Sequence, residues 1–182
     1  LPMHPSIFFP YFPNFVSSAE DFIESYNHWS GAIVLTSDTS SGSLIKKGPL
    51  WKYKLNNFDS NHLLDGLTQL VRSYYLAGAE EIMISSSPTM HWKKSNNEDI
   101  DKFLNKILSI KNQPYRLLLG SAHQMGTARI NPNPKHGVVD LNGKVHGLEN
   151  VYIVDASTFP RCSGVNPMIS IQSMSHFLMS NI

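Results

Sequence analysis

The sequence predicts an α+β fold, with an antiparallel sheet and helices in most of the chain and one further strand and helix at the C-terminal end. Apolar residues recur with helical spacing in two stretches, residues 59–79 and 97–110. Short apolar or alternating segments bounded by turn residues lie before, between and after them, and such segments are typical of strands. The chain has 182 residues, 41% of them hydrophobic and 16% charged, which is the composition of a globular protein.

The first elements follow from proline content and alternation. Residues 1–16 contain four prolines and predict an extended segment, and residues 17–29 begin with serines and acidic residues that favour a short helix. GAIVLTSD (31–38) predicts a strand, TSSGS (39–43) a turn, and LWKYKL (50–55) a second strand.

The central elements are the most regular part of the chain. The helix at 59–79 has Asp59 as its expected N-cap and Gly78 near its end. EEIMISS (80–86) predicts a buried strand. The apolar positions of the two helices are Leu63, Leu67, Leu70, Val71 and Tyr74 in the first, and Ile100, Phe103, Leu104 and Ile107 in the second.

The last third predicts a strand, a loop and a helix. NVYIVDAS (150–157) reads as the strand, FPRCSGV (159–165) as the loop, and residues 166–181 as the helix. Asn166 would occupy the N-cap and Pro167 the first helical position, where a missing N–H costs nothing. Such a helix start presents backbone N–H groups and a positive dipole end, which favours negative charge nearby.

Composition excludes several classes of protein. A formal net charge of +1 argues against an electrostatic nucleic-acid binder, and the single cysteine, Cys162, allows no intramolecular disulfide. No apolar run approaches the roughly 18 residues of a membrane span. The compartment stays open, with an intracellular one favoured; only the family resemblance below allows a membrane-associated or peroxisomal one. Because the sequence begins with Leu1 rather than methionine, we expect a piece of a longer protein.

Five ordered elements carry a family resemblance. They are His-x-x-Gly-Thr from His123, Gly-Val-Val-Asp from Gly137, the run from Val145 to Ser157, a proline, and Asn-Pro-Met from Asn166. Together they resemble the C-terminal signature of the glucose-methanol-choline family of flavin oxidoreductases. WKYKLNNFDSNHLLDGL (51–67) and GVNPMISIQS (164–173) are similar to its long-chain alcohol oxidase branch. The chain departs from that branch at SDTSSGSL (37–44), where a fuller Arg-Asp-rich strand and turn is usual.

The resemblance implies an alcohol oxidation. Hydride passes from the alcohol carbon to flavin N5, with O₂ or another acceptor reoxidising the flavin, while the histidine corresponding to His123 removes the hydroxyl proton. Imidazole suits this role because its ordinary pKa, about 6.5, lies near working pH. Asn166 corresponds to the residue that hydrogen-bonds the substrate oxygen. Pro167 and Met168 would open a helix whose backbone N–H groups face the pyrimidine edge of the flavin. Asp155 would bind the ribityl chain of the flavin, and Ala156 and Asn166 would also contact the cofactor.

Other interpretations remain open for the same residues. His123 could bond only to backbone, Asn166 could only cap its helix, and Asp155 could simply end a strand. Cys162 is expected to be an inert loop or buried thiol, and His176 a packing or surface side chain.

Two other kinds of site are conceivable. His136 and His146 could form a metal pair, but no third ligand of suitable spacing accompanies them, so no metal is expected. A hydrolase would use Ser121 or Ser163 with His123 and Asp155, but the sequence has no Gly-x-Ser-x-Gly elbow.

The resemblance also implies what is missing. None of the eleven glycines forms the Gly-x-Gly-x-x-Gly turn that holds the ADP part of FAD. We expect residues 1–29 to return from an FAD domain, residues 30–118 to form a substrate domain, and residues 119–182 to contribute to the active site and complete the FAD domain. The chain alone would bind FAD poorly and be inactive. A truncated, noncatalytic module is the alternative.

Overall fold

The computed structural model describes residues 24–45, 51–111, 113 and 115–181. The chain divides into two compact units, Leu1–Leu119 and Gly120–Ile182. The extended segment expected at 1–16 lies outside the described residues, as does most of the helix expected at 17–29. Of that helix, the described part includes the 3₁₀ turn η2 (Tyr26–His28).

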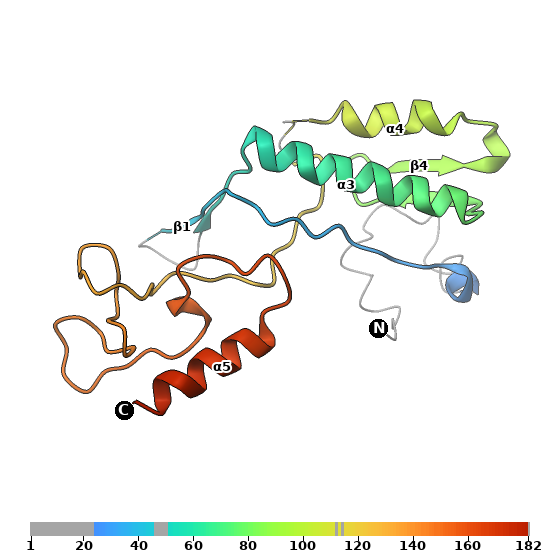
Figure 1. Ribbon diagram of the computed structural model, residues 1–182. Helices are drawn as coiled ribbons and strands as arrows, with labels where there is room; N and C mark the ends of the chain where they lie inside the picture. Colours follow the sequence, from blue (N-terminus) through green and yellow to red (C-terminus); the bar gives the residue numbers. More distant parts are fainter. Residues whose placement is uncertain (1–23, 46–50, 112, 114, 182) are drawn as a thin grey trace. The chain divides into compact units, whose positions relative to one another are not determined.

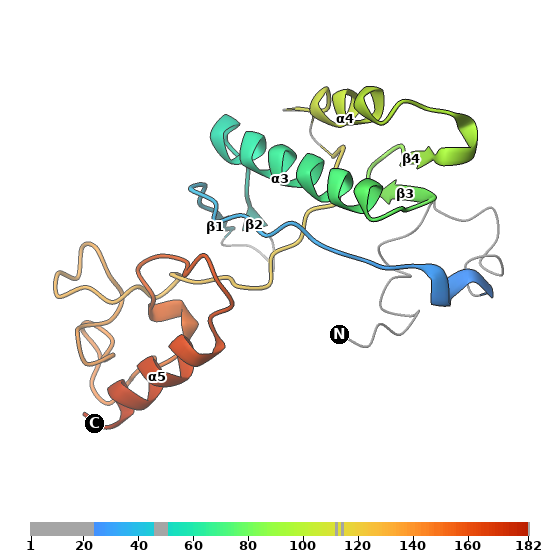
Figure 2. The same ribbon diagram turned by 45° about the vertical axis from the view of Figure 1, so that its right-hand side comes forward.

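The first unit is a helical layer on a two-stranded hairpin (Figures 1 and 2). Strands β3 (Glu81–Ile84) and β4 (Met90–Lys93) pair antiparallel, with Ile82 opposite Trp92. A 3₁₀ turn, η3 (Lys94–Asn96), leads from β4 toward α4 (Ile100–Leu108), and α3 (Asn57–Leu76) precedes the hairpin. The strand predicted at 80–86 and both central helices are therefore confirmed, with ends shifted by a few residues.

The core of the first unit lies between these helices and one face of the hairpin. Alternate strand residues point inward, as the period of two requires, and the helices supply their apolar stripes. Of the nine positions predicted from helical spacing, four are buried in this core and the other five are partly buried. The buried set is Leu64, Val71, Ile82, Ile84, Met90, Trp92, Phe103, Leu104, Ile107 and Ile110.

The cap predicted for α3 is wrong. Asn56 is the N-cap, and its side chain accepts a hydrogen bond from the Asp59 N–H at 2.8 Å. The Asp59 side chain is buried, and its two oxygens accept bonds from the N–H and hydroxyl groups of both Thr39 and Ser40.

The strand predicted at 31–38 and the turn at 39–43 are also wrong. Residues 31–42 have no regular secondary structure. A short antiparallel pair forms later in the chain instead, between β1 (Ser43–Leu44) and β2 (Trp51–Lys52). Of the strand predicted at 50–55, the described chain forms β2, Trp51–Lys52. A strand needs a hydrogen-bonded neighbour, and residues 31–38 have none in the described chain.

The second unit consists of turns, isolated bridges, the 3₁₀ turn η4 (Ala156–Thr158) and α5 (Met168–Met179). The strand predicted at 150–157 is wrong: Tyr152 forms one antiparallel bridge with Lys144, and the chain then enters η4. The predicted C-terminal helix is confirmed as α5, but its N-cap is Pro167 rather than Asn166. Within the described ranges, no helix has the length and apolar character to cross a bilayer.

Candidate functional site

His123 lies in a loop of the second unit that is held by short-range bonds. Gln124 Nε2 donates to the Ser121 carbonyl at 2.6 Å, and Arg129 Nε donates to the Gly126 carbonyl at 3.1 Å. The His123 residue is half-buried, and its ring makes no hydrogen bond to any described residue. Nothing in the described chain therefore supports the alternative in which the His123 ring only bonds to backbone. Both ring nitrogens are without a hydrogen-bond partner among the described residues.

This loop is joined to the segment that follows Asp155. The Ala128 N–H donates to the Ser157 carbonyl and the Ile130 N–H to the Thr158 carbonyl, both at 2.9 Å. Farther along, the Cys162 thiol lies 3.8 Å from the His123 carbonyl oxygen. Two motifs that are well separated in sequence are thus neighbours in the second unit.

Gly126 is the point of closest approach in this junction. Its φ of +83° lies in the left-handed region, and a Cβ there would sit 3.1 Å from the Phe159 carbonyl oxygen. A side chain would therefore meet both backbone strain and a fixed backbone atom. Sequence reasoning used this glycine as part of a motif and did not foresee its steric role.

Asp155 occupies the N-cap of η4. Its Oδ1 accepts from the Ser157 N–H at 2.7 Å and from the Ser157 hydroxyl at 2.5 Å. These two bonds lower the pKa of Asp155, because they stabilise the carboxylate and outweigh the effect of partial burial. Asp155 stays ionised near neutral pH, and its Oδ2 accepts no bond from the described residues. Ala156 is the first residue of η4.

The start of α5 presents an exposed polar corner. Pro167 is buried, and its carbonyl accepts the first helical bond from Ile171 at 2.8 Å, so the N–H groups of residues 168–170 have no helical partner. Asn166 is exposed, and its side chain forms no hydrogen bond in the described chain. The capping interpretation of Asn166 is therefore wrong, which leaves the amide free for another partner.

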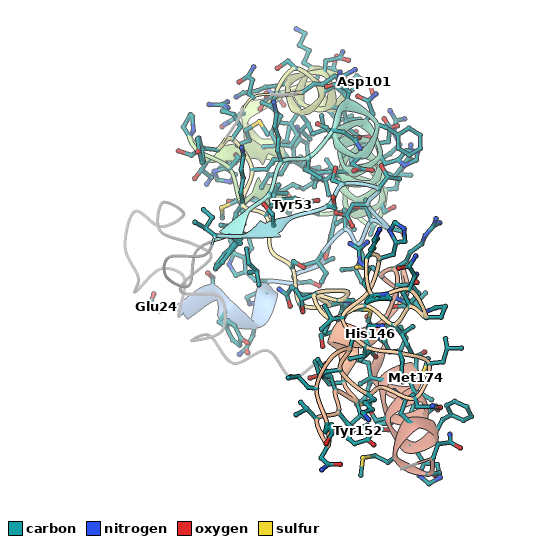
Figure 3. All side chains as sticks on the ribbon, turned by 90° about the vertical axis from the view of Figure 1, so that its left-hand side faces the viewer. Glu24, Tyr53, Asp101, His146, Tyr152 and Met174 are labelled. Carbon is teal, nitrogen blue, oxygen red and sulfur yellow. The ribbon has the colours of Figure 1, made fainter. Side chains whose placement is uncertain are left out.

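Helix α5 is fixed to the segment that leads into Asp155. The Ser175 hydroxyl donates to the Val154 carbonyl, and Leu178 is fully buried. A Cβ at Gly143, whose φ is +78°, would lie 3.5 Å from Leu178 and 3.0 Å from the Ile153 carbonyl oxygen. The later half of α5 therefore packs against the segment that leads into Asp155. Figure 3 shows the side chains of this unit, including Met174 on α5.

The structure joins the loops of the site but does not test every pairing predicted for it. No described hydrogen bond links the His123 ring to the Asn166 amide, and their convergence on one substrate stays a prediction. The histidine pair is not assembled by a shared partner: His136 is exposed, whereas His146 Nε2 lies 2.8 Å from the Asn131 carbonyl oxygen. Among the described residues, no group of three or more metal-ligating side chains occurs.

The hydrolase alternative lacks its hydrogen bonds. The Ser163 hydroxyl donates to the Val165 carbonyl, and Asp155 is engaged by Ser157. In the described chain no bond connects His123 with either serine candidate or with Asp155, so no nucleophile, base and orienting acid are assembled.

The residues present fit one end of a flavin. The unpaired N–H groups at the start of α5 and its dipole suit the electron-rich edge of a flavin ring, and the ionised Asp155 can accept hydroxyl donors of a ribityl chain. Nothing in the described chain fits the diphosphate end, because that end needs a glycine-rich turn at a helix start.

The sequence profile described as GMC oxidoreductase matches residues 31–175. A long-chain-alcohol oxidase of Arabidopsis thaliana is 31% identical over 163 residues, which cover 86% of this chain and 22% of that protein. A second long-chain-alcohol oxidase of the same plant is 29% identical over 188 residues, covering 99% and 25%.

A bacterial oxidase shares a shorter stretch. The 6'''-hydroxyparomomycin C oxidase of Streptomyces lividus is 48% identical over 54 residues, which cover 30% of this chain and 10% of that protein. The chain spans about a quarter of the length of the long-chain-alcohol oxidases that it matches.

Proposed function

The chain belongs to the GMC oxidoreductase family, and we propose that it is the C-terminal portion of an FAD-dependent enzyme that oxidises a primary, long-chain alcohol to the aldehyde. The observation that carries this proposal is the junction of the His123 loop with residues 157–162, which lie between Asp155 and Asn166. The names of the plant relatives support the choice of substrate class.

His123 is proposed as the general base. Its ring has no hydrogen bond to a described residue, so a ring nitrogen is free to take the proton of the substrate hydroxyl. A positioned base contributes roughly 10²- to 10⁴-fold to the rate. The flavin, when bound, supplies the acceptor for the hydride that leaves the alcohol carbon. The Asn166 amide would donate a hydrogen bond to the substrate oxygen and hold it in place.

The start of α5 is proposed to stabilise negative charge. The backbone N–H groups of residues 168–170 and the positive end of the helix dipole would stabilise negative charge on the flavin ring. Met168 is the first residue of this helix, and Pro167, as its N-cap, sets the direction in which the helix begins. Asp155 and Ala156, at the start of η4, would contact the ribityl chain. Each group is supplied by backbone or side chains that the second unit fixes locally.

A separate region is needed for the rest of the cofactor. The chain contains no Gly-x-Gly-x-x-Gly sequence, so we propose that the ADP part of FAD is bound by the portion of the longer protein outside this chain. The chain alone would then bind FAD poorly and be inactive. Its substrates would be the alcohol and O₂ or another electron acceptor.

The ultraviolet-visible spectrum of the complete protein tests this proposal. We expect flavin absorption bands that bleach without oxygen when a long-chain primary alcohol is added, and that do not respond to an alkane of the same length. A complete protein without flavin bands would overturn the proposal and would favour a noncatalytic module. Flavin bands that no alcohol bleaches would overturn the substrate class.

A further inference from the structure

Residues 85–87 continue β3 beyond its last residue. Ser86 forms an antiparallel bridge with Leu117, and the Ser87 N–H donates to the Arg116 carbonyl at 2.9 Å. Directly opposed residues of an antiparallel pair share one face, so the Arg116 side chain is on the face of Ser87. Leu117 packs against the core of the first unit from the other face. Arg116 and Ser87 therefore lie on the face that is turned away from the core.

Charges at the far end of this outer face are paired with one another. Glu81 begins β3 and is opposite Lys93 of β4. The Glu81 carboxylate accepts a hydrogen bond from Lys93 Nζ at 3.0 Å and lies 2.9 Å from His91 Nε2. The two basic residues of β4 on this face thus share one acidic partner.

Arg116 forms no ion pair with any described residue. Its Nη1 donates to the Ser87 carbonyl at 2.7 Å, and its Nη2 makes no hydrogen bond in the described chain. Its Nε is shielded from solvent and is, within the described ranges, the one buried side-chain nitrogen or oxygen without a partner. The residue as a whole is half-buried. A guanidinium that is largely withdrawn from water is costly unless an anion offsets its charge, so this arrangement lacks an anion.

Two hydroxyl groups on the same face are also unused. Ser85 lies two residues before Ser87 and therefore shares its face. The hydroxyls of both residues form no hydrogen bond in the described chain, whereas the Ser86 hydroxyl donates to the Pro88 carbonyl at 2.9 Å. Ser85 is half-buried and Ser87 is exposed, so a ligand can reach both hydroxyls.

We propose that Arg116, with the hydroxyls of Ser85 and Ser87, is a binding site for a carboxylate. Arg116 Nη2 and the two hydroxyls donate hydrogen bonds to the carboxylate oxygens, and the negative charge offsets the charge that the buried Nε shares. One cation matches one negative charge. A doubly charged phosphate would need a second free cation, and Lys93 is already engaged by Glu81.

This site goes beyond the proposed function, because Arg116 belongs to the first unit and every residue proposed for alcohol oxidation lies in the second. Its carboxylate can come from a free small molecule or from an acidic side chain of the longer protein outside this chain. Two measurements on the complete protein separate these sources.

The melting temperature in sodium acetate, at constant ionic strength, tests for a free carboxylate. We expect a saturable rise of roughly 1–4 °C, which acetamide, the neutral analogue of similar shape, does not produce. Arg116→Gln should abolish the rise. Lys102→Gln, which removes an exposed cation of α4, is the control and should retain it.

Stability at two pH values detects an acidic side chain that already fills the site. Acetate would then have no effect, and Arg116→Gln would leave that carboxylate without its cation. The variant should be less stable than the parent at pH 7, and the difference should shrink as the pH falls to 4, because protonation removes the unpaired charge.

The proposal is overturned when neither signature appears. Acetate would then act equally on the parent and on Arg116→Gln, or on neither, and the stability lost in the variant would be the same at pH 7 and pH 4. Arg116 would in that case serve only to hold the Ser87 carbonyl.

Discussion

The Cys162 thiol lies 3.8 Å from the backbone carbonyl oxygen of His123, so the loop before α5 touches the residue proposed as general base. A thiol is a weak donor, and this contact is long, so it adds little to stability. Its importance is positional, because this thiol, which was expected to be inert or buried, is exposed and lies beside the loop that carries His123.

Alkylation of Cys162 is therefore expected to inhibit the complete enzyme. A bulky maleimide on this thiol would occupy space next to His123 and lower turnover by at least about tenfold. The control is Cys162→Ser, which should retain turnover and resist the reagent. Full labelling with unchanged turnover would contradict the proposed location of the site.

Replacing the proposed base should remove most of the chemistry and little else. His123→Ala in the complete enzyme is expected to lower turnover by about 10²- to 10⁴-fold, the usual contribution of a general base. Flavin absorbance should remain, since the ring makes no bond that holds the described structure together. The matched control is His136→Ala, an exposed histidine of the same unit, and near-normal turnover of His123→Ala would refute the role.

Asn166 should affect catalysis and leave stability alone. Its side chain bonds to no described residue and does not cap α5, so Asn166→Ala is expected to leave the melting temperature unchanged. Flavin reduction by the alcohol, followed by stopped-flow absorbance, should slow by about 10-fold or more if the amide holds the substrate oxygen. Gln172→Ala, at an exposed position on the same helix, is the control. A change in stability alone would restore the capping interpretation.

Local patterns predicted the elements that local forces determine. Helix α4 was predictable because its apolar face and its cap, Asp99, are all encoded within a dozen residues. The irregular structure of residues 31–38 was not predictable, because whether such a segment forms a strand depends on a hydrogen-bonded neighbour, and the described chain supplies none. The cap assignment of Asp59 was wrong because its bonds to Thr39 and Ser40 join residues about twenty positions apart. A local pattern of apolar residues does not reveal such bonds.

The candidate site divides in the same way. Its residues were identified by ordered motifs, but the contact that joins them, between residues 126–130 and 157–159, is made by backbone atoms and leaves no signal in side-chain type. The one-residue difference at the start of α5 also matters chemically. With Pro167 as N-cap, Asn166 lies outside the helix and its amide is released from capping.

Gly126→Ala should loosen this junction. The φ of +83° and the nearby Phe159 carbonyl together make a methyl group unfavourable by about 1–2 kcal/mol. Hydrogen exchange at the Ala128 and Ile130 amides, which bond across the junction, should accelerate by about 5- to 30-fold. Gly120→Ala is the control, because a Cβ there meets no atom within 4 Å. Equal exchange in both variants would show that the close approach is not rigid.

The buried carboxylate of Asp59 should make the first unit sensitive to acid. Burial by itself raises the pKa of Asp59, but the bonds from Ser40 and Thr39 prevail and lower it below the ordinary value of 3.8. The carboxylate is therefore easier to protonate in the unfolded chain than in the folded one. Its stabilising effect is complete above about pH 4 and is lost as the pH falls through the lowered pKa of the folded state.

Urea unfolding at several pH values checks this expectation, with tryptophan fluorescence as the signal, to which the buried Trp92 of the first unit contributes. Asp59→Asn keeps the size of the side chain but cannot ionise, so it should be less stable at neutral pH and lose less stability than the parent between about pH 4 and pH 2. Asp65→Asn, at an exposed position of α3, should retain the parent's acid dependence. Equal losses of stability in Asp59→Asn and the parent over this range would contradict the expectation. The acid sensitivity would then have to come from another carboxylate, and the hydrogen bonds that join Asp59 to Thr39 and Ser40 would not depend on its charge.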